Sequence, residues 1–332
     1  MPTTNEKASV AVIGAGYWGI NLVRNFHATG RLKVVCDSST DSLKKVSDKF
    51  PGLPLETDYQ KILARSDISG VVIAAPAAMH YDLTRQALEA GKDVFVEKPL
   101  ALKFHEAYQL QRLAQSHERI LMVGHILQYH PGLLKLKELI TSGELGTLEY
   151  IYSNRLNLGK IRREENILWS FAPHDISIML WLTGSIPIQV NAVGGSYLTP
   201  NVFDTTISTL SFDNGVRGHV FVSWLHPFKE QRLVVVGSKR MATFVDSAPK
   251  GEKLLMYEKK ISDVNGALVA EKPKGVPVTF DEETEPLRAE CDHFLHCMET
   301  REKPRTDGEE GLKVLKVLQS CQRSLQMNGQ PV

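Results

Sequence analysis

The sequence predicts an α/β protein, with an N-terminal doubly wound parallel sheet followed by an α+β domain whose open sheet is mostly antiparallel. Two observations carry this prediction. In residues 1–125, short and wholly apolar runs alternate with amphipathic helical stretches, and such strands belong in a parallel sheet that helices cover on both faces. Beyond that point the strand-like runs are longer and follow one another directly, as in an antiparallel sheet. We therefore expect two domains, residues 1–125 and 126–332.

The first domain is predicted to alternate strands with helices. Its expected strands are residues 10–13, 33–36, 71–75, 94–96 and 120–123. Between the first two strands, Trp18, Leu22 and Phe26 recur at helical spacing until Gly30 ends the helix. Further helices are expected around residues 43–50, 83–91 and 110–113.

The second domain is predicted to start with a helix and to continue as a sheet. The helix is expected at residues 133–140, and the strands at 148–158, 188–193, 205–212, 216–224, 232–236 and 241–245. Asn214-Gly215 stands between the third and fourth of these strands and is a strong hairpin signal. Two late helices, 286–300 and 308–327, close the chain, and residues 250–274 are expected to form a loop.

Composition excludes several classes of function. The chain carries 39 Lys and Arg against 38 Asp and Glu, so it lacks the basic surface of a general nucleic-acid binder. No apolar run approaches the roughly 20 residues that span a bilayer, and Met1–Ser9 is polar, unlike a signal peptide. The four cysteines lack the spacing of a structural metal site. We therefore expect a cytoplasmic protein with no nucleic-acid or membrane partner and no bound metal.

A glycine motif follows the first predicted strand and opens the first helix. In Gly14-Ala15-Gly16-Tyr17-Trp18-Gly19, the first glycine permits the tight turn, the second admits a pyrophosphate close to the backbone, and the third allows close helix packing. We place Tyr17 and Trp18, between the second and third glycines, in the same cofactor site. The motif predicts a dinucleotide site, and a methyltransferase site is the nearest alternative.

An acidic residue completes this cofactor fingerprint. Asp37 ends the second strand 18 residues after Gly19, where a carboxylate accepts hydrogen bonds from an adenosine ribose, and Ser38 lies beside it. The alternative for Asp37 is a cap for the following helix. Because the carboxylate would repel a 2′-phosphate, it favours NAD over NADP.

Two more strand ends belong to the same predicted site, since ligands of open α/β sheets bind outside the carboxyl ends of the strands. Ala75 and Pro76 end one strand, and His80 follows, either lining the cofactor or lying at the surface where a helix starts. Glu97 and Lys98 end the next strand and precede Pro99.

These motifs resemble the Gfo/Idh/MocA family of oxidoreductases. The matching pieces are Gly14–Gly19, Glu97-Lys98-Pro99, Gly143-Glu144-Leu145-Gly146 and Pro173-His174-Asp175 at the opening of a helix, in the family's order over most of the chain. The resemblance implies a Rossmann domain, a cis Lys98–Pro99 bond, and a catalytic Lys98 at the nicotinamide end. It also makes His174 the active-site histidine, in contact with substrate. Many members carry an aspartate where this chain has Ser170, which leaves Lys98 and His174 as the working pair.

The ordinary pKa values of the two side chains divide their roles. Oxidation of an alcohol needs a base for the hydroxyl proton, and imidazole, near ~6.5, suits neutral pH better than lysine, near ~10.4. We assign His174 as the base, while cationic Lys98 orients the hydroxyl and stabilises the developing alkoxide. The opposite assignment stays open, because an oxidised nicotinamide beside Lys98 would lower the pKa of that lysine.

A cationic stretch in the second domain predicts an anionic substrate. Its candidate binding residues, with His174, are Arg155, Asn157, Lys160, Arg162 and Arg163; guanidinium groups bind carboxylates and phosphates bidentately, although a solvated loop is the alternative for Lys160 and Arg162. This stretch resembles the subgroup that oxidises the 3-hydroxyl of UDP-N-acetylglucosaminuronic acid for bacterial surface polysaccharide (O-antigen). In some members NADH stays bound and is reoxidised by 2-oxoglutarate, and the resemblance allows the same for this chain.

Two other functions compete with this one. The first is dehydrogenation of another sugar or of inositol, which would not need the cationic stretch. The second is a non-catalytic NAD-binding regulator, against which the presence of both Lys98 and His174 argues. The apolar strands 205–212 and 216–224 expose more sheet than two late helices can cover, so we expect a homo-oligomer, and the resemblance implies a tetramer.

Overall fold

The structure, a computed structural model, describes residues 7–159, 161–163 and 165–332. Internal contacts divide the chain into two compact units. The first joins Met1–Tyr129 to Glu285–Leu315, and the second joins His130–Thr284 to Lys316–Val332. The chain thus leaves the first unit close to the predicted boundary at residue 125, but residues 285–315, which the prediction placed in the second domain, pack with the first unit.

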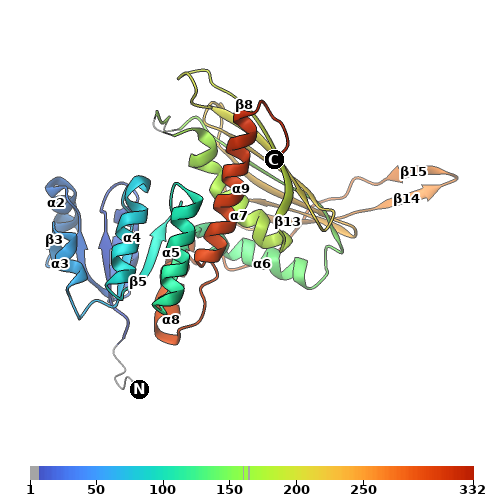
Figure 1. Cartoon of the computed structure of the whole chain (residues 1–332). Helices are drawn as coiled ribbons and strands as arrows, with labels where there is room; N and C mark the ends of the chain where they lie inside the picture. Colours follow the sequence, from blue (N-terminus) through green and yellow to red (C-terminus); the bar gives the residue numbers. More distant parts are fainter. Residues whose placement is uncertain (1–6, 160, 164) are drawn as a thin grey trace. The chain divides into compact units, whose positions relative to one another are not determined.

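The first unit contains a six-stranded parallel sheet with helices on both of its faces (Figure 1). The strand order is β3-β2-β1-β4-β5-β6, so the order reverses between β1 and β4, as in a doubly wound fold. Its elements are β1 (Val10–Ile13), α1 (Gly19–Ala28), β2 (Leu32–Cys36), α2 (Thr40–Lys49), β3 (Leu55–Glu56), α3 (Tyr59–Leu63), β4 (Gly70–Ile73), η1 (Ala77–Met79), α4 (His80–Glu89), β5 (Asp93–Glu97), α5 (Phe104–Ser116), β6 (Leu121–Gly124), η2 (Ile126–Tyr129) and α8 (Pro286–Thr300). The doubly wound parallel sheet is confirmed.

The register of this sheet brings the ends of its central strands level. Ile13 pairs with Cys36 on one side and with Ile73 on the other, and Ile73 in turn pairs with Val96. The four residues belong to different strands and form one row across the sheet. The segments predicted to bind the cofactor follow this row directly, so they emerge along one edge of the sheet.

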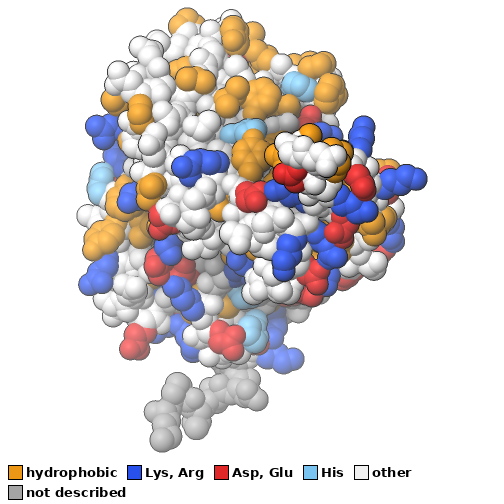
Figure 2. Space-filling view, turned by 90° about the vertical axis from the view of Figure 1, so that its right-hand side faces the viewer, with side chains coloured by type: hydrophobic (Ala, Val, Ile, Leu, Met, Phe, Trp, Pro, Cys, Tyr) orange, Lys and Arg blue, Asp and Glu red, His pale blue; other side chains and the backbone are white. Residues whose placement is uncertain are grey.

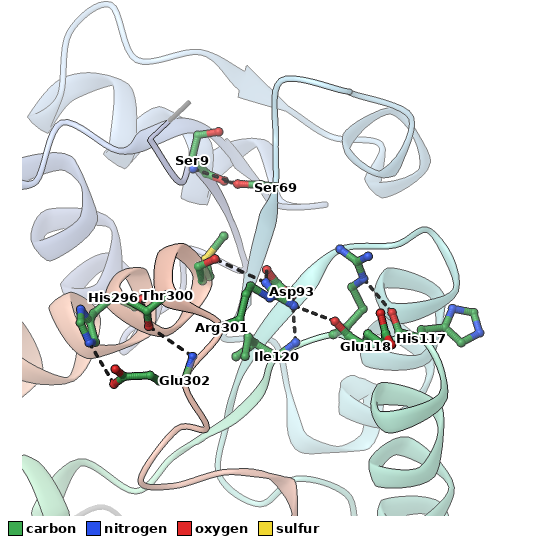
Figure 3. Close-up of polar contacts among 12 residues, drawn as sticks. Ser9, Ser69, Asp93, His117, Glu118, Ile120, His296, Thr300, Arg301 and Glu302 are labelled. Atoms are coloured by element: carbon green, nitrogen blue, oxygen red, sulfur yellow. Dashed lines mark hydrogen bonds and ion pairs between the residues drawn. The ribbon is translucent and has the colours of Figure 1, made fainter. Parts of the chain in front are cut away.

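Helix α8 belongs to the first unit because its apolar face completes that unit's core. Phe294 packs against Phe95 of β5, with ring centroids 5.8 Å apart, and against Phe26 of α1 at 6.5 Å. At the end of the helix, Arg301 donates to both carboxylate oxygens of Asp93, at 2.6 and 3.1 Å, and to the carbonyl of Glu118 (Figure 3). Burial of a phenylalanine side chain stabilises a fold by about 1.5–3 kcal/mol. The amphipathic pattern of α8 indicated a helix but did not indicate which sheet it covers.

The second unit is an eight-stranded mixed sheet with helices on one face. Its strand order is β16-β13-β12-β11-β7-β10-β9-β8, in which only the β7–β10 pair is parallel. Its elements are α6 (Pro131–Thr141), β7 (Leu148–Leu156), α7 (Ile167–Thr183), β8 (Pro187–Gly195), β9 (Thr205–Phe212), β10 (Arg217–Ser223), β11 (Glu230–Gly237), β12 (Arg240–Val245), β13 (Leu254–Glu258), β14 (Ile261–Val264), β15 (Ala267–Ala270) and β16 (Val276–Pro277), with α9 (Gly308–Gln326) continuing into it from the first unit. The open, mostly antiparallel sheet is confirmed.

The predicted hairpin at Asn214-Gly215 is also confirmed. It joins β9 to β10, which pair antiparallel. Gly215 has φ +86°, a left-handed conformation that glycine adopts without a steric penalty. The Asn214 side chain accepts a hydrogen bond from the amide of Val216 at 3.2 Å, which closes the turn.

Two expectations for the second unit were wrong. Residues 250–274 were expected to be a loop, but they contain β13 and the hairpin of β14 and β15, which projects from its unit in Figure 1. All eight hairpin residues are exposed, so the polar and apolar alternation that marks a half-buried strand was missing. Pro173 was expected to open a helix, yet α7 begins six residues earlier at Ile167, where the Asn166 side chain accepts from the amide of Trp169.

Helix α7 covers one face of the second sheet and leaves the other open. On the open face, Tyr152 of β7 stacks on His219 of β10, with ring centroids 4.9 Å apart. Val193 and Ile207 on the same face are 53% and 44% exposed. Figure 2 shows hydrophobic side chains gathered on the side of the molecule from which the β14–β15 hairpin projects. Within the described residues, no helix combines the length and the apolar character needed to cross a bilayer.

Candidate functional site

The glycine loop between β1 and α1 has the geometry that the sequence predicted for it. Gly14 has φ +92°, and a Cβ there would lie 2.8 Å from the backbone of Ala74. A Cβ on Gly19 would lie 2.0 Å from the carbonyl oxygen of Gly14. The fold itself therefore requires glycine at both positions.

Gly16 differs from its two neighbours in the motif. A Cβ built there meets no atom within 4 Å among the described residues. The first turn of α1 carries no acidic residue, and Trp18 at its N-cap makes no side-chain capping bond. The loop thus combines open space above a glycine with helix amide groups whose partial positive charge attracts an anion. This arrangement fits the pyrophosphate of a dinucleotide.

Asp37 ties the end of β2 to the glycine loop. Its Oδ2 accepts from the amide of Ala15 at 2.7 Å, and its Oδ1 accepts from the amide of Ser39 at 2.8 Å. The cap of α2 is Ser39, not Asp37, so the capping alternative is not what the structure contains. Each carboxylate oxygen retains a lone pair for a ribose hydroxyl. Ser38 is exposed beside it.

The segment after β4 differs from the prediction. The strand ends at Ile73, two residues before the predicted end, so Ala75 and Pro76 lie in the connection that leads to η1. His80, however, is 1% exposed, and its Nδ1 and Nε2 lie 2.7 and 2.9 Å from the carbonyl oxygens of Pro99 and Ala75. Burial, with a smaller contribution from Lys98, lowers the pKa of the imidazole. We therefore assign His80 to holding these two loops together rather than to contact with the cofactor.

Glu97 and Lys98 stand at the end of β5. The carboxylate of Glu97 accepts from the indole Nε1 of Trp18 at 2.5 Å, which joins β5 to the glycine loop. Burial raises the pKa of Glu97, against the opposing effects of Trp18 and Lys98. The Lys98–Pro99 bond is cis, as the resemblance implied.

A buried polar cluster at the end of β6 was not predicted. His125 is 2% exposed, and its Nδ1 lies 2.5 Å from Glu310 of α9. Gln128 donates to the other oxygen of Glu310 at 2.7 Å. His125 follows Gly124, which pairs with Glu97, so the strand-end rule that identified Glu97 could also have identified His125.

In the second unit, the geometry of α7 positions His174. The next residue, Asp175, is buried, and its carboxylate accepts from Ser153 at 2.5 Å and from Arg155 at 2.7 and 3.1 Å. These contacts fasten α7 to β7, and His174 lies half-buried beside them. We accordingly assign Arg155, predicted to bind substrate, to positioning α7. Ser170, where many family members have aspartate, is buried on the same helix.

The rest of the predicted cationic stretch connects β7 to α7. Just beyond the end of β7, the backbone amide of Asn157 donates a hydrogen bond to the backbone carbonyl of Ser223 at 3.0 Å. Arg162 forms an ion pair with Glu165 at 2.9 Å, and the side chains of Arg162 and Arg163 are exposed. Lys160 lies outside the described residues. Across residues 7–159, 161–163 and 165–332, no group of three or more His, Cys, Asp or Glu side chains is arranged to hold a metal ion.

Known proteins resemble the chain along almost its whole length. An uncharacterised oxidoreductase of Bacillus subtilis, YrbE, is 25% identical over 97% of this chain and 95% of its own. UDP-N-acetylglucosamine 3-dehydrogenase of Acidithiobacillus ferrooxidans is 26% identical over 92% of this chain and 93% of its own.

Solved structures share the fold. A structure of that UDP-N-acetylglucosamine 3-dehydrogenase matches with a TM-score of 0.84 at 23% identity, covering 96% of this chain and 98% of that chain. A levoglucosan dehydrogenase in complex with NADH and L-sorbose matches with a TM-score of 0.84 at 18% identity, covering 98% of each chain.

Two family models divide the chain much as the fold does. One, described as the oxidoreductase family with an NAD-binding Rossmann fold, matches residues 8–125. The other, described as the GFO/IDH/MocA C-terminal domain, matches residues 133–243. The glycine loop, Asp37 and the segment around Lys98 all lie within the first match. The chain therefore belongs to the Gfo/Idh/MocA oxidoreductase family, and it carries that family's NAD-binding Rossmann domain.

Proposed function

We propose that the protein is an NAD-dependent dehydrogenase that oxidises the 3-hydroxyl of UDP-N-acetylglucosaminuronic acid to the 3-keto sugar, in the synthesis of bacterial surface polysaccharide. The observation that carries the proposal is the near-full-length likeness to an enzyme named for oxidising UDP-N-acetylglucosamine at the same position. The exposed arginines between β7 and α7 support the choice of an acidic sugar.

The cofactor site would hold NAD through three groups of this chain. The N-terminus of α1 and the open space at Gly16 receive the pyrophosphate, and Asp37 receives the adenosine ribose. NAD, when bound, supplies the hydride acceptor. The carboxylate of Asp37 repels a 2′-phosphate, which favours NAD over NADP.

Lys98 and His174 perform the proton chemistry in this proposal. The ammonium group of Lys98 donates a hydrogen bond to the reacting hydroxyl and stabilises negative charge on its oxygen. The imidazole of His174 accepts the hydroxyl proton. Asp175 acts as a positioning residue, since its bonds to Ser153 and Arg155 fix the turn of α7 that carries His174.

Substrate charge provides the sharpest test. With UDP-N-acetylglucosaminuronate, UDP-N-acetylglucosamine and myo-inositol as substrates, we expect the highest kcat/KM for the first. Arg162→Ala and Arg163→Ala should lower kcat/KM for the acidic sugar by about tenfold or more, because a hydrogen bond to a charged group contributes about 1.5–3 kcal/mol. The kcat/KM for UDP-N-acetylglucosamine, whose sugar lacks the carboxylate, should fall less. Arg112→Ala, at an exposed arginine of α5, is the matched control.

The outcomes separate the candidate substrates. Preference for inositol would overturn the nucleotide-sugar assignment. If the enzyme prefers UDP-N-acetylglucosamine and the two arginine variants have no effect, the 3-dehydrogenase reaction would stand, but the assignment of an acidic sugar as substrate would be wrong. Reoxidation of bound NADH by 2-oxoglutarate is part of the proposal and is measured by adding 2-oxoglutarate in single-turnover assays. A cytoplasmic location is also part of the proposal, and the four buried free thiols are consistent with a reducing compartment.

We also propose that the enzyme is a homotetramer in which a second copy covers the open face of the second sheet. The exposed Val193 and Ile207 support this, since contiguous apolar surface is usually buried in an interface. Sedimentation velocity at micromolar concentration should give a tetramer. Ile207→Lys should shift it to smaller species, whereas Tyr108→Lys, at an exposed apolar position of α5, should not. A monomeric wild type would contradict the proposal.

A further inference from the structure

Glu290 of α8 is a buried acid that the proposed chemistry does not use. Its side chain is 0% exposed, and neither carboxylate oxygen has a hydrogen-bond partner among the described residues. A buried polar group without a partner costs about 1–3 kcal/mol, and more when it is charged. An apolar residue would serve the packing of α8 better, so stability alone gives no reason for an acid at this position.

The packing of α8 on β5 places Glu290 beside Glu97. Arg301, after the end of the helix, bonds to Asp93 at the start of β5 (Figure 3), and Phe294 packs on Phe95 in the middle of the strand. The helix therefore runs antiparallel to the strand. One helical turn before Phe294 is Glu290, on the same face of α8, and two residues after Phe95 is Glu97, on the same face of β5.

Few of the groups that face the two carboxyl groups carry a positive charge that could compensate a carboxylate. Glu97 faces Trp18 of the glycine loop, Lys98 just after the end of β5, His125 after β6, and Glu290. Glu290 faces Glu97, Tyr129 of η2 and Cys291 of its own helix. Burial first, and then the charge of Glu97, raises the pKa of Glu290 well above its ordinary value. Glu290 is fully buried and Glu97 is half-buried. Two adjacent carboxyl groups in such a place hold a proton between them because ionising both places like charges together.

We propose that Glu97 and Glu290 share one proton, which leaves for solvent when the cationic nicotinamide of NAD⁺ binds and returns when the cofactor is reduced. The inference rests on the proposed placement of the nicotinamide end at Glu97 and Lys98. One carboxylic O–H bond breaks on binding of NAD⁺, the proton passes to water, and the electron pair stays on the carboxylate. Reduction removes the ring charge, so the carboxylate then takes a proton back from water. The pair thereby favours the oxidised cofactor more strongly as pH rises.

Titration calorimetry of the full-length protein tests the pair. Binding of NAD⁺ and of NADH is measured between pH 6 and 9, in two buffers of different ionisation enthalpy, to count the protons exchanged. We expect wild type to release a proton, in whole or in part, with NAD⁺ but not with NADH. The ratio of the NADH Kd to the NAD⁺ Kd should then rise by up to about tenfold per pH unit. In Glu290→Gln this difference in proton release should vanish and the ratio should become flat.

Three variants keep the test specific. Lys98→Met should retain the proton release, since lysine is the other group that could supply the proton. Asp292→Asn removes a charge from the exposed side of α8, where Asp292 pairs with Arg288, and should behave like wild type. Glu290→Met removes the acid at nearly constant length, should the amide variant fold poorly. A carboxyl group whose pKa is raised by folding makes the folded protein less stable as pH rises. The Tm of Glu290→Gln should therefore increase relative to that of wild type from pH 6 to 9.

The outcomes distinguish this inference from the proposed function. Equal proton release in wild type and Glu290→Gln would overturn the pair, and loss of release in Lys98→Met would identify the lysine as the source. Equal proton counts for NAD⁺ and NADH in wild type would also overturn it, with the dehydrogenase assignment intact. A protein that binds neither cofactor would overturn both.

Discussion

Replacing Lys98 or His174 with alanine is expected to reduce kcat by about two to four orders of magnitude, the range that general acid–base groups contribute. Lys98→Ala removes the cation that stabilises the developing alkoxide, and His174→Ala removes the acceptor of the hydroxyl proton. Absorbance of NADH measures turnover, and fluorescence of bound NADH measures the cofactor Kd. We expect that Kd to change by less than about tenfold in His174→Ala.

Two exposed residues of α5 and its N-terminal flank serve as controls. Lys103→Ala and His105→Ala remove the same side chains from the surface of the first unit and should keep wild-type turnover. Near-normal kcat in Lys98→Ala or His174→Ala would contradict the role assigned to that residue. The pH profile separates the two assignments of the base: if His174 is the base, the acid limb of kcat/KM disappears in His174→Ala and persists in Lys98→Ala.

Gly16→Ala is expected to bind NAD about 10- to 100-fold more weakly, equivalent to about 1.4–2.8 kcal/mol, while its stability is unchanged. The added methyl group meets no protein atom within 4 Å among the described residues, so it can only obstruct a ligand. Isothermal titration with NAD and a thermal melt without ligand give the two numbers. A large fall in Tm would contradict the reasoning, and so would unchanged affinity.

Gly14→Ala provides the contrast. Its Cβ would lie 2.8 Å from the backbone of Ala74, at a φ of +92° that alanine disfavours. The left-handed conformation costs about 1–2 kcal/mol and overpacking about 1–3, so this variant should lose stability before any ligand is added. The two glycines of one motif thus separate into one that the fold needs and one that the ligand needs.

Most of the cofactor half could be predicted from local patterns. Apolar runs identify strands, and parallel strands end along one edge, so the sequence alone places Asp37, Ala75 and Glu97 near the glycine loop. The burial of His80 between two carbonyl groups was not predicted, because the sequence carries no signal for the groups that its ring meets. Glu290 did leave a signal, namely an acid in the apolar stripe of α8 that Leu287 and Phe294 define.

The second unit was harder to predict from the sequence, because the contacts that determine its structure join residues far apart in the chain. Arg155 looked like a ligand for an anion, and no local pattern indicated that Asp175, twenty residues later, would bind it. The family resemblance placed Pro173 at the opening of a helix, yet Asn166 caps this helix seven residues earlier. Which elements share a core depends on tertiary packing, and the same reason explains why α8 was placed in the wrong domain.

The return of α8 to the first sheet has a consequence for biosynthesis. A ribosome releases Phe95 and Phe26 long before Phe294, their packing partner, has been translated. Until residues 285–315 emerge, one apolar side of the nascent nucleotide-binding sheet lacks its cover, and chaperones have a target there. For the same reason a fragment ending at residue 125 is expected to aggregate rather than to yield a minimal cofactor-binding domain.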